Sequence, residues 1–189
     1  MKDFHENASK DATNKKHNKA LISEIVSYMM AAILLLIGVK CIVFLGLIPS
    51  KSMEPTLQVH DVTIGNRLAY KKKIPQRGDL IIFSSDELDE VLCKRIIGLP
   101  GETVSFHNGF VYINDEKLDE SAYLSDEIET NSIDSFTVPD NCYFVLGDNR
   151  ENSNDSRFWS DPYVSVDDIE AKVLVTIPTH TLFESSRRR

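Results

Sequence analysis

Three short stretches of the sequence hold residue types that could carry chemistry. They are residues 49–57 (PSKSMEPTL), 94–101 (KRIIGLPG) and 147–157 (GDNRENSNDSR). The second is the most informative by itself: side chains alternate faces along a strand, so Lys94 would lie between Leu92 and Ile96. A lysine desolvated by such neighbours loses basicity and becomes a candidate general base near neutral pH. The same pattern also fits an ordinary strand lysine whose amine reaches water.

Signatures of several common hydrolases and metalloenzymes are missing. There is no G-x-S-x-G elbow, no H-E-x-x-H zinc motif and no phosphate-binding G-x-x-x-x-G-K-[ST]. The five histidines lack metal-ligand spacing, and neither Cys93 nor Cys142 has a C-x-x-C partner, which argues against zinc. The three cysteines allow at most one intrachain disulfide, and nothing in the sequence requires it. We therefore expect no metal and no organic cofactor.

Length and composition limit the possible classes of protein. The chain has 189 residues, enough for one modest domain with an appendage, and its 42% hydrophobic content excludes wholesale disorder. The net charge of −8 is uneven, at +2 over residues 1–20 and −10 over residues 49–189. Such an acidic body argues against nucleic acid as a partner, because phosphates need a basic face.

A long apolar run precedes the first of the three stretches. Residues 25–48 contain one charge, Lys40, and a helix needs about 20 residues to cross the hydrocarbon core of a bilayer. A buried core helix would show a polar stripe at helical spacing, which is missing. A cleaved secretory signal would be shorter, although Ser50-Lys51-Ser52 weakly matches a small-x-small site. We therefore expect residues 21–48 to be a transmembrane signal anchor that stays attached.

The distribution of lysines predicts how this span is oriented. Four of them precede it closely, at positions 10, 15, 16 and 19, which favours a basic cytoplasmic tail over residues 1–20. Positive charges also follow the span, at Lys51, at Arg67 and over residues 71–73, so the bias is not one-sided. The prediction is a single-pass protein with residues 49–189 outside the cytoplasm.

Strand signals dominate the rest of the chain. Short β-branched or apolar runs bounded by turn residues occur at 62–65, 80–83, 91–98, 103–106, 110–113, 143–146 and 171–177. Asn108-Gly109 between two of them predicts a tight hairpin. The pattern favours a mainly β fold, either a barrel or a folded sheet. Residues 119–137 are acidic and weakly patterned, as in an exposed loop or small subdomain, and residues 185–189 form a basic tail.

Taken together, the motifs resemble those of bacterial type I signal peptidases, the membrane-anchored Ser-Lys proteases that remove signal peptides from exported proteins. After one N-terminal span come PSKSMEPTL, the RGD-hydrophobic run over residues 77–83, KRIIGLPG and GDNRENSNDSR, in the family's order. The similarity extends from the anchor to about Trp159. The short chain between residues 101 and 138, with no second span, is similar to the smaller Gram-positive form. The resemblance implies a signal-peptidase-like β fold.

The resemblance also implies roles for individual residues. Ser52 matches the family's nucleophile and Lys94 its general base. Ser50 matches a residue whose hydroxyl joins the Ser52 backbone N–H in the oxyanion hole. Ser153 matches the hydroxyl that orients the lysine. The remaining matches are a supporting ion pair, Asp155 and Arg157, and a further supporting position, Asp148.

The function implied is cleavage of signal-peptide-bearing preproteins after small-x-small sites, at the surface of a bacterial cell membrane, by a monomer. One rival is a Ser-Lys autopeptidase of the LexA type, but that class carries a DNA-binding module where this chain has an apolar run. A second rival is an inactive, membrane-tethered β domain that binds a partner, which the presence of both Ser52 and Lys94 disfavours. Microsomal-type relatives have histidine in place of Lys94, so a bacterial protein is favoured.

Overall fold

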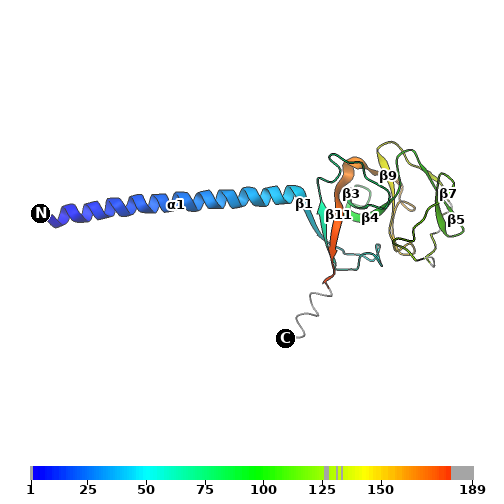
Figure 1. Cartoon of the computed structure of the whole chain (residues 1–189), viewed down its shortest axis with the longest axis horizontal. Helices are drawn as coiled ribbons and strands as arrows, with labels where there is room; N and C mark the ends of the chain where they lie inside the picture. Colours follow the sequence, from blue (N-terminus) through cyan, green and yellow to red (C-terminus); the bar gives the residue numbers. More distant parts are fainter. Residues whose placement is uncertain (1, 126–127, 131, 133, 180–189) are drawn as a thin grey trace, which may run out of the picture. The chain divides into compact units, whose positions relative to one another are not determined.

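The computed structural model describes residues 2–125, 128–130, 132 and 134–179. It divides into two compact units, Met1–Cys41 and Ile42–Arg189. The first consists of one continuous helix, α1 (Lys2–Ile42), drawn in blue in Figure 1. Its last 22 residues, Leu21–Ile42, are apolar enough to cross a membrane. At 1.5 Å per residue they span about 33 Å, which matches a bilayer core.

The apolar run predicted as one span is divided between a helix and a strand. The helix ends at Ile42, and the next five residues form β1 (Val43–Leu47), which pairs antiparallel with β2 (Val62–Asn66). Such residues suit a helix or a strand equally well, and here the partner strand satisfies their backbone groups. The helix thus stops six residues before position 48, the end that the sequence predicted for the anchor.

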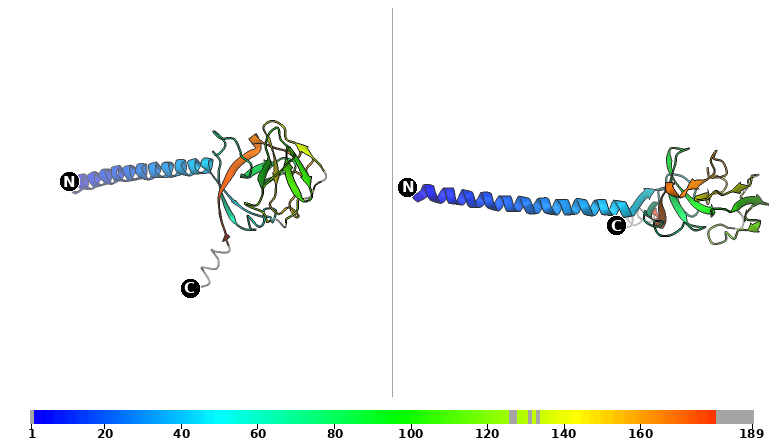
Figure 2. Two further views of the ribbon diagram at one scale, coloured as in Figure 1. Left: turned by 45° about the vertical axis from the view of Figure 1, so that its right-hand side comes forward. Right: turned by 90° about the horizontal axis from the view of Figure 1, so that it is seen from above.

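A seven-stranded antiparallel sheet forms most of the second unit. Its order is β1-β2-β11-β3-β4-β9-β10. The additional strands are β3 (Leu80–Ser85), β4 (Glu90–Gly98), β9 (Cys142–Leu146), β10 (Val164–Ser165) and β11 (Ile169–Ile177), the last preceded by the short 3-10 helix η1 (Val166–Asp168). Strand β11 lies between β2 and β3, so the last strand of the described chain pairs with two of the first strands (Figures 1 and 2).

A smaller sheet follows the order β7-β6-β5-β8. Its strands are β5 (Thr103–His107), β6 (Phe110–Ile113), β7 (Glu116–Lys117) and β8 (Phe136–Thr137). The turn between β5 and β6 has positive φ at Asn108 (50°) and Gly109 (81°). Asparagine and glycine tolerate this conformation best, which confirms the hairpin predicted from the sequence.

The core comprises two large apolar clusters and one small one. One large cluster joins the small sheet to Ile97 and Phe144 of the large sheet, and the other packs Ile96 against Phe83. The small cluster contains Ile48, Met53 and Leu57, and it anchors residues 49–57 to the sheet. Burial of a large apolar side chain contributes roughly 1.5–3 kcal/mol, so Met53 and Leu57 hold this stretch firmly.

The mainly β fold predicted from the sequence is confirmed, and each predicted run coincides with a strand. The strands that sequence patterns did not reveal are β1 and the two-residue strands β7, β8 and β10. Two residues carry no detectable period, so only pairing with a neighbour defines such elements.

Candidate active site

The pairing of β4 with β9 places Lys94 beside the third motif. Arg95 is the partner of Leu146, the last residue of β9, so the chain leaves the sheet at Gly147, next to Lys94. The Lys94 side chain lies inside the protein, with the residue only 2% exposed, and its amine donates to Ser153 Oγ at 3.1 Å. Of the two interpretations left open by the sequence, the water-exposed lysine is therefore excluded.

Gly147 is the point where the first and third motifs approach each other most closely. A Cβ atom at this position would overlap both the Ser153 hydroxyl and the backbone carbonyl oxygen of Ser52. Only glycine leaves room for both groups, because real Cβ atoms do not approach other heavy atoms so closely. The absence of a side chain at Gly147 thus allows Ser52, Ser153 and Lys94 to share one site.

The serines of the first motif are tied to the third motif by Asn149. Its backbone N–H donates to the Ser52 carbonyl at 3.1 Å, and its Nδ2 donates to the Lys51 carbonyl, also at 3.1 Å. The hydroxyl oxygens of Ser50 and Ser52 are 3.2 Å apart and form a hydrogen bond. Ser52 is partly exposed and Ser50 exposed, so a substrate can reach both hydroxyls.

Lys94 and Ser52 are linked indirectly, through Ser153 and Gly147. Within the described residues, no hydrogen bond joins the amine to the Ser52 hydroxyl, and the amine instead donates to Ser153. Hydrogen bonds used in catalysis are often long before substrate binds and tighten afterwards. Two serine hydroxyls and a buried amine around one glycine make an arrangement that suits acyl transfer.

Two buried ion pairs hold the third motif in place. Asp155 accepts from Arg157 Nε at 2.8 Å and Nη2 at 2.9 Å, and also from the backbone N–H groups of Gly147 at 3.0 Å and Arg157 at 3.4 Å. Asp148 accepts from Arg95 Nε at 2.8 Å and Nη2 at 2.6 Å, and also from the Thr56 hydroxyl. Both carboxylates are wholly buried, and each is compensated by a guanidinium and a further donor, as buried charges require.

The environment of Lys94 lowers the pKa of its amine. Burial is the largest cause, because it disfavours the charged form, and the positive charge of Arg157 acts in the same direction. Interactions with Asp155, Cys93 and Asp148 act in the opposite direction without overcoming burial. A neutral amine can accept a proton, which a general base must do.

This depressed pKa predicts a pH-dependent stability difference. Below its folded-state pKa, Lys94 carries a full energetic penalty in the fold. The penalty disappears as pH rises to the unfolded-state value near 10.5. Lys94→Met removes the ionisable group and keeps an unbranched side chain. We expect the variant to melt at a higher temperature than the wild type at pH 7, with an advantage that shrinks toward pH 10.

Thermal melts of the full chain in detergent micelles at several pH values measure this difference. The gain is reduced by loss of the hydrogen bond to Ser153, which typically contributes about 0.5–1.5 kcal/mol. Lys72→Met, which alters an exposed lysine, serves as the control and should show no such pH trend. If the melting temperature of Lys94→Met showed no pH-dependent advantage over the wild type, the pKa of the Lys94 amine would not be lowered in the free protein.

The structure brings together all the site residues that the sequence singled out. Ser50, Ser52, Lys94 and Ser153 gather near Gly147, and Asp148, Asp155 and Arg157 lie directly behind them. The sequence did not reveal the structural roles of Gly147, Asn149 and Arg95. All three lay within the quoted motifs, but their contacts are long-range and could not be deduced from spacing.

The thiol beside Lys94 is not a second candidate nucleophile. Burial raises the pKa of Cys93 to about 12, so this thiol stays protonated and is a poor nucleophile at neutral pH. Cys41, Cys93 and Cys142 are all free thiols. Among the described residues, no group of three or more His, Cys, Asp or Glu side chains is arranged to hold a metal ion.

Comparisons with known proteins point to one family. Residues 21–177 match the family model described as signal peptidase, peptidase S26. The probable signal peptidase I-2 of Synechocystis sp. is 36% identical over 163 residues, covering 82% of this chain and 74% of the relative. Signal peptidase I of Bacillus licheniformis is 37% identical over 161 residues, covering 77% and 82% respectively. Signal peptidase IB of Staphylococcus aureus is 33% identical over 172 residues, covering 82% and 88%.

One solved structure is also similar to this chain. The crystal structure of a signal peptidase I from Enterococcus faecalis V583 is 36% identical in sequence and covers 55% of this chain and 98% of its own, with a TM-score of 0.46.

Proposed function

Because this chain belongs to the signal peptidase family, peptidase S26, we propose that it is a membrane-anchored serine endopeptidase that removes signal peptides from preproteins. One observation carries the proposal. Lys94 is buried, and its amine donates a hydrogen bond to Ser153. The Ser153 hydroxyl and the Ser52 carbonyl both lie next to Gly147. This arrangement suits a serine activated by a neutral lysine.

In the proposed reaction, the neutral Lys94 amine takes the proton from the Ser52 hydroxyl. The Ser52 oxygen attacks the scissile carbonyl and forms a tetrahedral intermediate. As the peptide bond breaks, the Lys94 ammonium gives its proton to the leaving amine. Lys94 then removes a proton from a water molecule, which attacks the ester on Ser52. As the Ser52–acyl bond breaks, the Lys94 ammonium returns this proton to the Ser52 oxygen, and the signal peptide leaves with a free carboxylate.

The remaining site residues have supporting roles in this proposal. The Ser50 hydroxyl and the Ser52 N–H stabilise the oxyanion, and Ser153 orients the Lys94 amine by accepting its hydrogen bond at 3.1 Å. Asp155 and Arg157 hold the turn that carries Ser153, and Asp148 fixes the start of that turn through Arg95. The chemistry needs neither a metal nor an organic cofactor.

The proposed substrates are preproteins cut after a small-x-small sequence. Incubation of the full chain in detergent micelles with a signal-bearing preprotein tests the proposal, with mass spectrometry of the products. We expect one new N-terminus directly after the small-x-small site, and loss of cutting when the small residue before the bond is made bulky. An unchanged preprotein would favour the rival, a membrane-tethered module that binds a partner without cutting it.

We further propose a lipid surface as a partner of the second unit. Apolar side chains are exposed on β1, at Leu45 and Leu47, and on β11, at Leu174 and Val175, with exposures of 54–67%. Both strands pair with β2, one on each side of it, so these side chains belong to the same end of the large sheet. An exposed apolar surface of this kind is typical of a membrane or protein contact. Substrate emerging from a bacterial cell membrane would meet the site there.

The proposed orientation leads to a topology prediction. With the lysines of residues 1–20 on the cytoplasmic side, protease added to intact cells stripped of their wall should digest residues after Pro49 and spare an N-terminal tag. Immunoblots against tags at the two ends measure this. Permeabilised cells serve as the control, in which both tags should be lost. Digestion of the N-terminal tag in intact cells would invert the orientation.

A further inference from the structure

The acidic segment, residues 119–137, contacts the third motif, residues 147–157, which we call the active-site turn, through Glu120. The Glu120 carboxylate accepts from Arg150 Nη2 at 2.6 Å and Nη1 at 3.1 Å, and from the Tyr123 hydroxyl at 2.7 Å. The Arg150 side chain is fully buried and that of Glu120 is 13% exposed. Burial acts to lower the pKa of Arg150, but the hydrogen bonds and charge of Glu120 outweigh it and raise this pKa. Glu120 is therefore the counter-charge of a buried guanidinium.

Arg150 carries this contact to the centre of the site. Its Nε donates to the Gly147 carbonyl at 3.0 Å, and Thr130, also in the acidic segment, accepts from its Nη1. The Arg150 carbonyl in turn accepts from Arg157 Nη2 at 2.8 Å. Gly147 is the residue against which Ser153 and the Ser52 carbonyl pack. Glu120 is thus connected to Ser153 indirectly, through Arg150 and then Gly147.

The same carboxylate reaches a second arginine through Tyr123. The Tyr123 ring lies over the Arg95 guanidinium, with 3.9 Å between the guanidinium carbon and the ring centroid. Arg95 holds Asp148, the residue after Gly147. Glu120 therefore positions two arginines that fix the start of the active-site turn. It binds Arg150 directly and acts on Arg95 through the Tyr123 ring.

We propose that Glu120 is a positioning residue for catalysis, which holds the Arg150–Gly147 contact and thereby keeps Ser153 and Lys94 aligned. This inference rests on the function proposed above. Without the Glu120 charge, the buried Arg150 guanidinium lacks its main counter-charge, a costly state that favours its movement toward water. The Gly147 carbonyl then loses the hydrogen bond that Arg150 Nε donates to it, and the turn that carries Ser153 loosens. Misplacement of reacting groups by about 1 Å can lower rates by about 100-fold.

A positioning role and a merely structural one differ in their effect on Lys94. If the turn loosens, water reaches the Lys94 amine. The amine is then less desolvated, so its pKa rises. The acid limb of the pH profile of kcat/KM then moves to higher pH. The groups that act on the pKa of Lys94 are Asp155, Cys93, Arg157 and Asp148, and the Glu120→Gln substitution replaces none of them.

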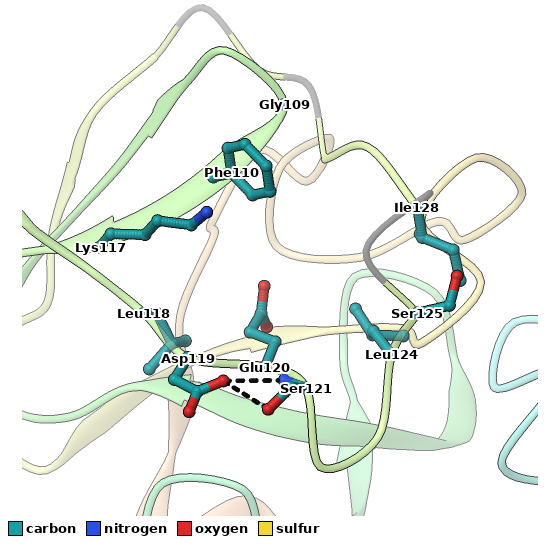
Figure 3. A pocket seen from close by; sticks show the side chains of 10 residues that line it. All are labelled: Gly109, Phe110, Lys117, Leu118, Asp119, Glu120, Ser121, Leu124, Ser125 and Ile128. Carbon is teal, nitrogen blue, oxygen red and sulfur yellow. Dashed lines mark hydrogen bonds between the residues drawn. The ribbon is translucent and has the colours of Figure 1, made fainter.

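Glu120→Gln tests the proposal in the full chain in detergent micelles, because it removes the charge and keeps the shape. The matched control is Asp119→Asn. In Figure 3, Glu120 extends into the pocket that it lines, whereas Asp119 turns back to accept from the backbone and hydroxyl of Ser121. We expect Glu120→Gln to lower kcat by at least about tenfold with little change in KM, and to shift the acid limb to higher pH. Asp119→Asn should match the wild type in all three quantities.

The outcomes separate the two proposals. Wild type that cuts no preprotein would defeat the proposed function itself. Wild type that cuts, together with a Glu120→Gln variant of unchanged kcat or unmoved acid limb, would overturn the positioning role alone. If Glu120→Gln does not fold, as judged by thermal melts, Thr130→Val decides, since it removes the other acceptor of Arg150 from the same segment. A smaller shift of the acid limb in the same direction supports the proposal, and an unmoved limb overturns it.

Discussion

We expect Ser52→Ala to lower the rate of preprotein cleavage by about 10⁴-fold or more, and Lys94→Met to do the same. Each change removes one member of a unit: the alkoxide source in the first case and the proton acceptor in the second. The double variant should be no slower than either single variant, because a missing nucleophile makes the base irrelevant. Values of kcat/KM for a signal-bearing substrate, measured on the full chain, provide the comparison.

Matched controls separate chemistry from folding in this experiment. Ser160→Ala and Lys72→Met alter exposed residues of the same types and should retain the wild-type rate. Thermal melts show whether each variant is folded. Substantial cleavage by folded Ser52→Ala would exclude Ser52 as the nucleophile, whatever the state of Lys94.

Removal of the Ser50 hydroxyl should lower kcat by about 10²–10³, the usual effect of losing one oxyanion donor, with little change in KM. In the free protein this hydroxyl is bonded to that of Ser52, at 3.2 Å, so it already lies beside the atom that attacks. Developing negative charge on the substrate oxygen is stabilised more than the neutral carbonyl, and the loss is therefore specific to the transition state.

Steady-state kinetics of Ser50→Ala and Ser50→Thr measure this contribution. Threonine keeps a hydroxyl at the position and should retain more of the rate than alanine does. A decrease of less than about threefold in Ser50→Ala, far below the usual effect of losing a donor, would mean that the Ser52 N–H suffices and that Ser50 points elsewhere during the reaction.

The local parts of the fold could be predicted from the sequence. Turn residues and β-branched runs identified β2 to β6, β9 and β11, and Asn108-Gly109 identified the hairpin between β5 and β6. The division of the apolar run at Ile42 could not be predicted. Residues 43–47 are as apolar as the helix before them, and only their pairing with β2 makes them a strand.

The active site was predictable to a similar extent. Strand alternation and the motif resemblance identified Lys94 and the serines, but not the depth at which the lysine is buried, because that depends on packing against other elements. Glu120 is the clearest omission. The acidic segment has no periodicity and no motif, and its bond to Arg150 joins positions 30 residues apart in the sequence. Contacts of this kind are set by the tertiary fold rather than by local pattern.

In the proposed mechanism, Ser52 attacks the scissile carbonyl and becomes acylated. The most direct test is to trap that ester on the full chain in detergent micelles with a slowly hydrolysed substrate analogue. Acid quenching, proteolysis and mass spectrometry then locate the acyl group. The mechanism predicts one acyl group, on the peptide that contains Ser52, and none in Lys94→Met at neutral pH. An acyl group on a different residue, or turnover of the analogue by Ser52→Ala, would contradict the account.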